Sequence, residues 1–384
     1  MGLSKRERVI RTLELEEPDM IPIHNMGFEH TAKVFQVYFE SEEKQKYSTQ
    51  VQNTHTGTKY LITEQRFWKV DIFEMDPFGP FKLKFKEKNA PPEYPDCRIN
   101  TITGVIRKNV KQVDTGLDYS WYVDGYFKTP EILHSFWDKH GKPIDRVNER
   151  INYSPQVWEG FVEAVSPYFY PMVITPINMV EELMGGLSFS RVAYYMRKNP
   201  PFIHEVMSEY TKALLEVIKR LNEAGVDIFF YGDDLGYKGG SMMSVEDYCE
   251  FFLPYHEQVY QTCKKYGMFV LHHSDGYIDN LVPYMVGAGV DCLQSLEAPA
   301  GVNLKKLKDD FGDRVAFMGG MDHSILGFGT PKEIEHEVIR CIKAAAQGGG
   351  YFAGPSHNIL NAPWENILAF RAAIEKHRKY PLNV

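Results

Sequence analysis

The chain has few cysteines for its length, and none of them form the pairs that bind structural zinc. Five cysteines occur in 384 residues, widely spaced, at Cys97, Cys249, Cys263, Cys292 and Cys341. Disulfide scaffolds are dense in cysteine, and cysteine-based zinc sites use closely spaced pairs. We therefore expect a reduced, cytoplasmic protein without a disulfide framework or a cysteine-based zinc site.

Long apolar runs and basic clusters are also missing. No apolar run approaches the ~18 residues that a membrane span needs. The charged opening MGLSKRERVIRTLELEEPD lacks the apolar stretch of a signal peptide. The formal charge is -8, whereas a nucleic-acid-binding protein usually carries a basic face. We expect neither a membrane nor a nucleic acid as partner.

The chain does have eight short apolar runs, most of them separated by helical patterns. Such near-continuous runs are typical of buried parallel strands. Capping boxes at Ser4 and Thr330 mark two helix starts. Eight strands alternating with helices predict an α/β fold, the (β/α)8 barrel. The first two strands are the weakest assignments, so another α/β arrangement stays open. The runs cover 20–25, 70–76, 169–176, 226–234, 268–275, 290–297, 315–322 and 350–357.

The chain is longer than the ~250 residues that such a barrel usually needs. The excess lies mostly between 28 and 168, where the spacing of apolar residues is irregular. Residues 97–110 alternate like a β-hairpin. We expect one barrel domain over 1–384, with an insertion at about 28–168 that covers one mouth. The sequence leaves homo-oligomer formation open.

Acidic and imidazole side chains follow nearly every predicted strand. In barrels of this kind the chemistry lies at the carboxyl ends of the strands. One polar residue there is more often a turn or cap residue. The whole set, however, would converge on one mouth, where so many carboxylates need a cation. The residues are His24, Asn25, Asp76, Asn178, Glu182, Asp233, Asp234, His273, Asp275, Glu297, Asp322, His323 and His357.

The stretch VLHHSDGYI carries the clearest metal-binding pattern. His273 and Asp275 are two residues apart in extended chain, so their side chains point the same way and that of His272 points to the other side. His357 ends the last run, and Glu297 is a candidate fourth ligand. Imidazole and carboxylate ligands suit zinc with one position left for substrate. The alternative is a turn role for His357 and a core role for His272.

The pair Asp233–Asp234 gives a second candidate, because adjacent strand residues point to opposite faces and only one need reach the mouth. We expect Asp233 or Asp234 to act as acid, base or ligand, with a structural role as the equal alternative. Other polar residues near the mouth are expected to bind substrate: His24, Asn25, Asn178, Tyr237 and Asp322.

Several stretches together resemble the uroporphyrinogen decarboxylase superfamily, which implies the same barrel fold. The decarboxylases carry an Arg-Gln-Ala-Gly-Arg stretch after the first strand, where this chain has HNMGFEHTA without arginine. The missing arginines argue against a polycarboxylate substrate. The stretches are SKRERVIRTLELEEPDMIPI (4–23), YGDDLGYKGGSMMSVEDYCEFFLPY (231–255), VLHHSDG (270–276), AGVDCLQSLEA (288–298), FGTPKEI (328–334) and GGGYFAGPSHNI (348–359).

The resemblance extends to a branch of zinc-dependent methyltransferases that work with corrinoid proteins. Its thiol-methylating members use His-x-Cys-Gly and a further Cys. Here His273 matches, Asp275 stands where Cys is expected, and His357 falls at or next to the second Cys. Harder ligands make zinc a stronger Lewis acid, which suits an oxygen leaving group.

The resemblance therefore implies methyl transfer from an O-methyl donor, a methoxylated aromatic compound, to the Co(I) of a corrinoid carried by a partner protein. Three alternatives are kept: a decarboxylase, a methylcobamide:thiol methyltransferase, and a non-catalytic barrel that binds a corrinoid partner.

Overall fold

The computed structural model describes most of the chain. Asn25 and Asp76, two of the predicted strand-end residues, lie outside the described residues. No helix within the described part of the chain is long and apolar enough to cross a membrane. The described residues are 2–24, 33–48, 56–75, 87–100, 102–111, 118–150, 160, 162–359 and 362–384.

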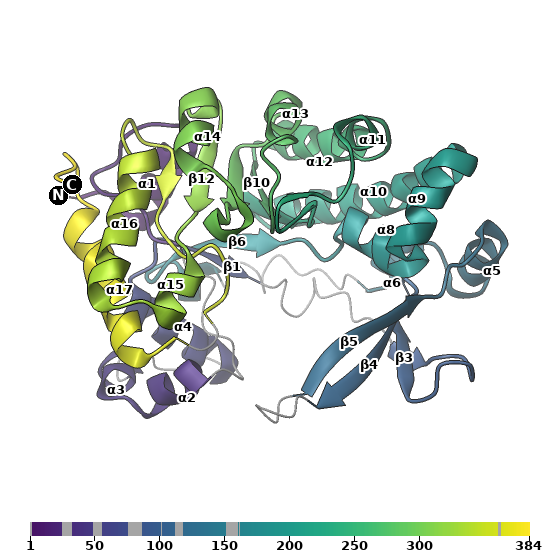
Figure 1. The fold of residues 1–384 in the computed structure, drawn as a ribbon, viewed down its shortest axis with the longest axis horizontal. Coiled ribbons are helices and arrows are strands. Elements are labelled where there is room, and N and C mark those ends of the chain that lie inside the picture. The colour runs from purple at the N-terminus through teal and green to yellow at the C-terminus, as the bar shows by residue number, and fades with distance from the viewer. Residues whose placement is uncertain are drawn as a thin grey trace.

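A curled sheet of seven parallel strands forms the centre of the molecule (Figure 1). The first apolar run supplies the eighth position, because Ile23 bridges Ala353 and His24 bridges Ile72, both in parallel. The ring of strands is thereby closed, and the predicted (β/α)8 barrel is confirmed. In spatial order the seven strands are β1 (Ile72–Met75), β6 (Tyr170–Ile174), β7 (Ile228–Gly232), β10 (Phe269–Ser274), β11 (Cys292–Ser295), β12 (Ala316–Gly319) and β13 (Tyr351–Phe352).

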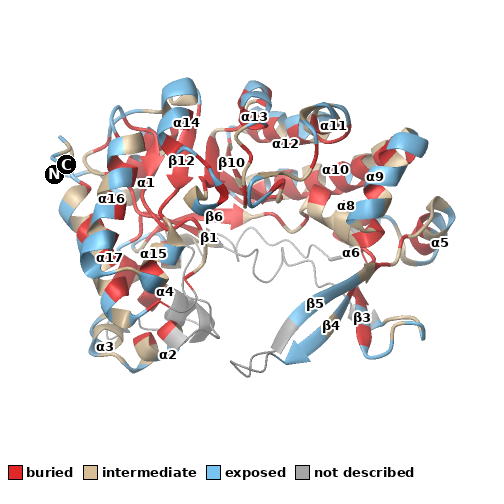
Figure 2. Cartoon of the chain, in the orientation of Figure 1, coloured by how far each residue is buried: buried red, intermediate tan, exposed pale blue. Residues whose placement is uncertain are grey.

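The strands are apolar along their length because both of their faces are buried. One face fills the barrel interior with side chains such as Ile72, Phe230 and Leu271, and the other packs against the surrounding helices. Val9 and Leu13 of α1 belong to the interior cluster, so this helix plugs one end of the barrel. Figure 2 shows the central strands buried and the outer faces of the helices exposed.

Helices surround the sheet, and the capping boxes predicted at Ser4 and Thr330 are both present. A short hairpin, β8 (Gly236–Tyr237) and β9 (Gly240–Ser241), follows β7. The helices are α1 (Lys5–Leu13), α8 (Met179–Leu187), α9 (Phe189–Lys198), α10 (Pro200–Glu223), α11 (Val245–Phe251), α12 (Leu253–Lys265), α13 (Val282–Ala288), α14 (Leu304–Phe311), α15 (His323–Phe328), α16 (Pro331–Ala345) and α17 (Trp364–His377), with a 3-10 turn, η2 (Ala298–Ala300).

Additional elements occupy the region of the predicted insertion at 28–168. The expected hairpin appears as the antiparallel pair β3 and β4, within a four-stranded sheet that projects from the barrel in Figure 1. This sheet is held against α8 by close backbone contact, since a Cβ on Gly125 would lie 2.3 Å from Gly186 O. The elements are α2 (Lys33–Glu40), α3 (Glu42–Ser48), α4 (Thr56–Trp68), β2 (Glu87–Asn89), β3 (Cys97–Asn100), β4 (Val105–Lys111), β5 (Asp118–Gly125), α5 (Pro130–His140) and α6 (Pro143–Arg150).

Closure of the barrel predicts an effect at Gly354, which follows β13. A Cβ there would lie 2.2 Å from His24 O, so Gly354→Ala forces the first strand away from β13. We expect the substitution to lower the free energy of unfolding by about 1–3 kcal/mol, measured by urea denaturation. Gly287→Ala is the control, because its Cβ meets nothing within 4 Å and alanine favours the helix by up to ~1 kcal/mol. Equal stability of the two variants would contradict this account of closure.

Candidate metal centre

Three polar side chains meet where β7 and β10 end. His273 Nε2 lies 3.6 Å from Asp234 Oδ1 and 3.8 Å from Asp275 Oδ1. One ligand atom from each of the three residues falls within 4.8 Å of the others. The loops are held together as well, because the Asp275 amide donates to Asp234 Oδ1 at 2.8 Å. We call this set the triad.

The orientation of His273 is fixed from the neighbouring strand β11. Its Nδ1 hydrogen-bonds to Gln294 Oε1. With a carbonyl oxygen as acceptor, Nδ1 carries the proton, and the lone pair of Nε2 faces the two carboxylates of the triad. A lone pair directed at two negative charges is unfavourable unless a proton or a cation lies between them.

Asp275 joins the triad to the last strand of the barrel. Its Oδ1 accepts a hydrogen bond from Ser295 Oγ at 2.8 Å, and His357 Nε2 lies 3.4 Å from its Oδ2. The hydrogen bond to Asp275 raises the pKa of His357 to about 9, against the opposing effect of burial. Burial would raise the pKa of Asp275, but His357 and His273 hold it down at about 2. Residues 82 positions apart in the chain thus form one charged pair.

The triad fits a small divalent cation. Tetrahedral zinc with bonds of ~2.0–2.1 Å places its ligand atoms roughly 3.3 Å apart, close to the two separations from His273 Nε2. The donor set is one imidazole and two carboxylates, and His273 has the hydrogen-bonded second nitrogen that is usual for metal-binding histidines. Asp234, His273 and Asp275 would hold the ion. His357, which was predicted as a ligand, contacts Asp275 and with Ser295 would orient that carboxylate.

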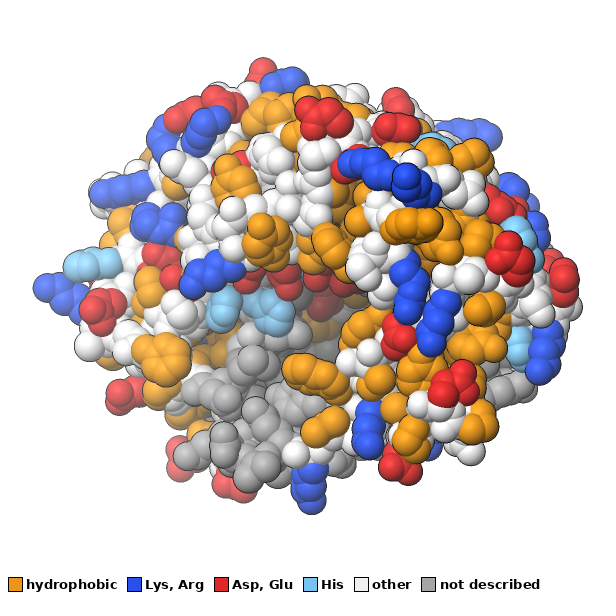
Figure 3. Space-filling view, turned by 45° about the vertical axis from the view of Figure 1, so that its right-hand side comes forward, with side chains coloured by type: hydrophobic (Ala, Val, Ile, Leu, Met, Phe, Trp, Pro, Cys, Tyr) orange, Lys and Arg blue, Asp and Glu red, His pale blue; other side chains and the backbone are white. Residues whose placement is uncertain are grey.

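The remaining predicted ligand, Glu297, lies beside the triad. Its Oε2 accepts from the Gly276 amide at 2.8 Å, and its charge helps to raise the pKa of His357. His323 lies at the same edge, where its ring is 5.8 Å from that of His357. Figure 3 shows histidine and acidic side chains gathered at the edge of a hollow.

The predicted substrate-binding residues are distributed unevenly. His24 is fully buried, and burial together with the nearby His273 lowers its pKa. Asn178 Oδ1 and the His273 ring both lie within 4 Å of the position that a Cβ on Gly232 would take. Tyr237, by contrast, is 57% exposed on β8, and Asp322 caps α15 by accepting from the Ser324 amide. Of the described residues in this set, His24 and Asn178 therefore have side chains near His273.

The two adjacent aspartates are separated by the strand geometry. Asp233 is fully buried on the outer side of β7 and accepts from the amides of Val180 and Glu181, both at 3.0 Å. Tyr231 Oη donates to it at 2.6 Å, and His256 Nε2 lies at 3.2 Å. Asp233 thus fixes the N-terminus of α8, and only Asp234 belongs to the triad.

His272 likewise points away from the mouth. Its Nδ1 hydrogen-bonds to Tyr260 Oη at 2.5 Å, and its Nε2 lies 3.3 Å from Asp233 O. Burial lowers its pKa well below the ordinary value. It has the core role that the alternation of the strand predicts.

Two carboxyl groups near the triad were not predicted. Burial, then Asp234 and Asp233, raise the pKa of Glu181 on α8 to about 8. Burial raises the pKa of Glu74 on β1 to about 7, although the nearby His273 and His357 lower this pKa. Glu74 could have been found from the sequence, because it alternates with the inward Ile72. Glu182, which was considered, lies instead near Thr103 and Arg107.

Comparison with known proteins gives a family match. Residues 172–377 match the family model described as uroporphyrinogen decarboxylase (URO-D). A uroporphyrinogen decarboxylase of Chlorobium luteolum is 26% identical over 180 residues, which are 46% of this chain and 49% of that protein. A methylated-thiol–coenzyme M methyltransferase of Methanosarcina mazei is 23% identical over 207 residues, which are 54% of this chain and 52% of that protein. The matched region spans about half the length of these curated relatives.

A solved structure agrees over a longer range. A methyltransferase from Methanosarcina mazei superposes with a TM-score of 0.64 and 16% identity, and the match covers 98% of this chain and 99% of that chain. At this identity the likeness concerns the fold.

Replacement of either adjacent aspartate by asparagine is expected to have a different effect, because Asp233 and Asp234 have different surroundings. Asp233→Asn weakens four contacts to a buried charge, so we expect a loss of about 3 kcal/mol in the free energy of unfolding. Asp234→Asn should leave stability within about 0.5 kcal/mol and instead reduce metal binding. Thermal and urea unfolding of both variants check this, and comparable destabilisation would show that Asp234 is also structural.

The triad predicts a bound divalent metal, most readily zinc. We expect one equivalent in the wild type and large losses in His273→Ala and Asp275→Asn, measured by elemental analysis after dialysis against zinc. Glu297→Gln should retain the metal, since Glu297 is engaged by the Gly276 amide. His336→Ala, on an exposed face of α16, is the control for loss of one imidazole. Equal metal content in the wild type and in His273→Ala would refute the site.

Proposed function

Because this chain belongs to the uroporphyrinogen decarboxylase (URO-D) family, we propose a function within it: transfer of a methyl group from an O-methyl donor to the Co(I) of a corrinoid protein. The donor class is a methoxylated aromatic compound. The acceptor corrinoid is carried by a partner protein, and zinc held by the triad is the resident metal.

The triad carries this proposal. Its donors are imidazole and carboxylate. Thiol-methylating relatives use a His-x-Cys-Gly motif, and in this chain Asp275 stands in the position of that cysteine. Zinc bound to hard ligands acts as a Lewis acid that stabilises negative charge on an oxygen. An ether oxygen needs this stabilisation as its methyl group leaves, because charge develops on it in the transition state.

The protein itself supplies position and a proton. Burial raises the pKa of Glu181 to about 8, so this carboxyl holds a proton at neutral pH. Glu181 can therefore protonate the departing oxygen as a general acid. Gln294 keeps His273 oriented through its Nδ1, and His357 with Ser295 keeps Asp275 oriented.

The decarboxylase alternative is disfavoured by charge. Uroporphyrinogen carries many carboxylates, and the decarboxylases of the family bind them with arginine. Within the described residues, no lysine or arginine forms an ion pair with Asp234, Asp275 or Glu181. A polyanion would be repelled by this mouth.

The proposal predicts how substitutions divide between rate and binding. Asp234→Asn and His273→Ala should lower the turnover rate by about 10²–10⁴-fold and change substrate affinity much less. The assay follows the corrinoid spectrum on methylation together with release of the phenol from a panel of methoxylated aromatics. Asp322→Asn is the matched control, because it makes the same change at a strand end outside the triad and should keep wild-type turnover.

The same assay separates the alternatives. If only a methylated thiol serves as donor, the ether proposal fails while corrinoid-dependent transfer stands. Conversion of uroporphyrinogen to decarboxylated product would replace the proposal with the decarboxylase. If no donor methylates any reduced corrinoid, the methyltransferase assignment is wrong.

A further inference from the structure

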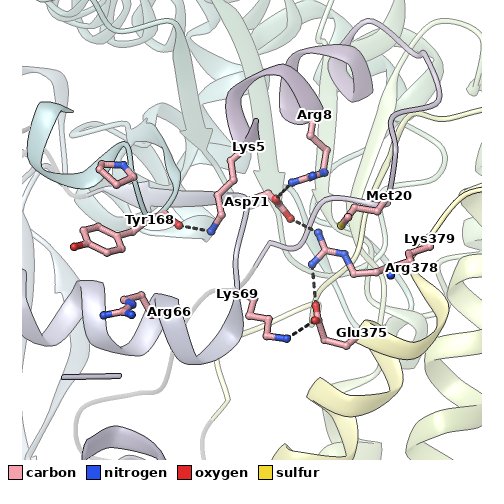
Figure 4. A pocket seen from close by; sticks show the side chains of 11 residues that line it. Lys5, Arg8, Met20, Arg66, Lys69, Asp71, Tyr168, Glu375, Arg378 and Lys379 are labelled. Carbon is pink, nitrogen blue, oxygen red and sulfur yellow. Dashed lines mark hydrogen bonds and ion pairs between the residues drawn. The ribbon is translucent and has the colours of Figure 1, made fainter. Parts of the chain in front are cut away.

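A polar cavity lies at the opposite end of the barrel from the triad. Its volume is about 510 Å³, and it opens where the chain enters β1 and β6, between α1, α4 and α17 (Figure 4). Its wall combines six basic and two acidic side chains with a few apolar ones. The lining residues are Lys5, Arg8, Met20, Arg66, Lys69, Asp71, Pro167, Tyr168, Glu375, Arg378 and Lys379.

The two carboxylates of this cavity are already saturated. Asp71 is 1% exposed and accepts from Arg8 Nη1 at 2.5 Å, from Arg378 Nη2 at 2.6 Å and from the Ile23 amide at 2.8 Å. Glu375 accepts from Lys69 at 2.5 Å and from Arg378 at 3.0 Å. These contacts leave the carboxylates little capacity for further cations.

Lys5 is a cation in this wall that forms no ion pair with a carboxylate among the described residues. Its ammonium donates to two main-chain carbonyls, Val70 O at 2.6 Å and Tyr168 O, as Figure 4 shows for Tyr168. An ammonium has three donors, so one remains for a further acceptor. Burial lowers the pKa of Lys5, which Asp71 partly opposes; a bound anion would relieve this cost.

The cavity therefore carries excess positive charge. Six basic side chains line the wall beside two carboxylates, and Asp19 pairs with Arg8 from outside the lining. Lys379 is exposed at the rim and, within the described residues, makes no side-chain ion pair. The ion pairs of Asp71 with Arg8 and Arg378 explain how α1 and the end of α17 are attached to the barrel. They do not explain why basic side chains outnumber acidic ones in the wall of the cavity.

We propose that this cavity binds a phosphorylated small molecule. Arg and Lys side chains are the usual partners of phosphate oxygens, and the volume lies in the range of small-molecule pockets, ~300–1,000 Å³. Phosphate alone would fill a small part of it. The ring of Tyr168, with Met20 and Pro167, supplies an apolar wall for the organic part. The site is independent of the triad and of the function proposed for it.

The test is isothermal titration calorimetry of the full chain with phenyl phosphate and with inorganic phosphate at constant ionic strength. We expect phenyl phosphate to bind more tightly. The double variant Lys69→Gln/Lys379→Gln, which removes two rim charges, should weaken binding by about tenfold or more. Lys376→Gln is the matched control. Lys376 lies in the last turn of α17, is 65% exposed, pairs with Glu335 and does not line the cavity. This variant should bind phenyl phosphate as tightly as the wild type does.

Lys5→Met probes the buried part of the site and should abolish binding, with circular dichroism confirming the fold. If this variant does not fold, the rim variant still decides the question. No binding by the wild type at millimolar phenyl phosphate, or equal affinity in the double variant and the control, would overturn the proposal. Tighter binding of inorganic phosphate than of phenyl phosphate would overturn the assignment to a phosphorylated small molecule and leave a site for free phosphate.

Discussion

The carboxylate of Asp71 joins the three parts of the chain that close the barrel. It accepts a hydrogen bond from the Ile23 amide of the first strand, and it pairs with Arg8 of α1 and with Arg378 beyond α17. Its charge is buried, and so are both arginines, so removal of any partner would strand an uncompensated charge. The register of the first strand, and with it the position of His24 at the mouth, depends on this contact.

Closure of the ring is also what gives the triad its surroundings. Asp234 and Asp275 lie in successive strand-to-helix loops, and their approach to His273 follows from the pairing of β7 with β10. His357 reaches Asp275 only because β13, two strands beyond β11, curls back toward the same mouth. The arrangement holds carboxylates and imidazoles close together in a partly buried place, where their charges must be neutralised by protons or by a cation.

Two regions of charge with opposite sign thus occupy the two ends of one barrel. The carboxyl end of the strands gathers the carboxylates of Asp234 and Asp275, whereas the amino end gathers lysines and arginines around Asp71. The first environment suits a metal cation, and the second suits an anion. The separation keeps the two sets from neutralising each other, since the apolar interior of the barrel lies between them.

The sequence by itself determined the barrel. All eight apolar runs became strand positions, because strands buried on both faces are mostly apolar along their length. Local pattern also sufficed for His273 and Asp275, whose spacing of two residues puts them on one side of an extended chain, and for the outward position of His272.

Only the tertiary structure decided which other groups join them. The sequence left Asp233 and Asp234 equal, and the packing of α8 against Asp233 separated them. Glu297 was predicted as a metal ligand, whereas the loops bring Asp234 to His273 and Asp275. Glu181 became relevant because α8 brings it to Asp234. These choices depend on contacts between residues far apart in the chain, such as Val180 and Asp233, which are 53 positions apart. Such contacts leave no periodic signal in the sequence.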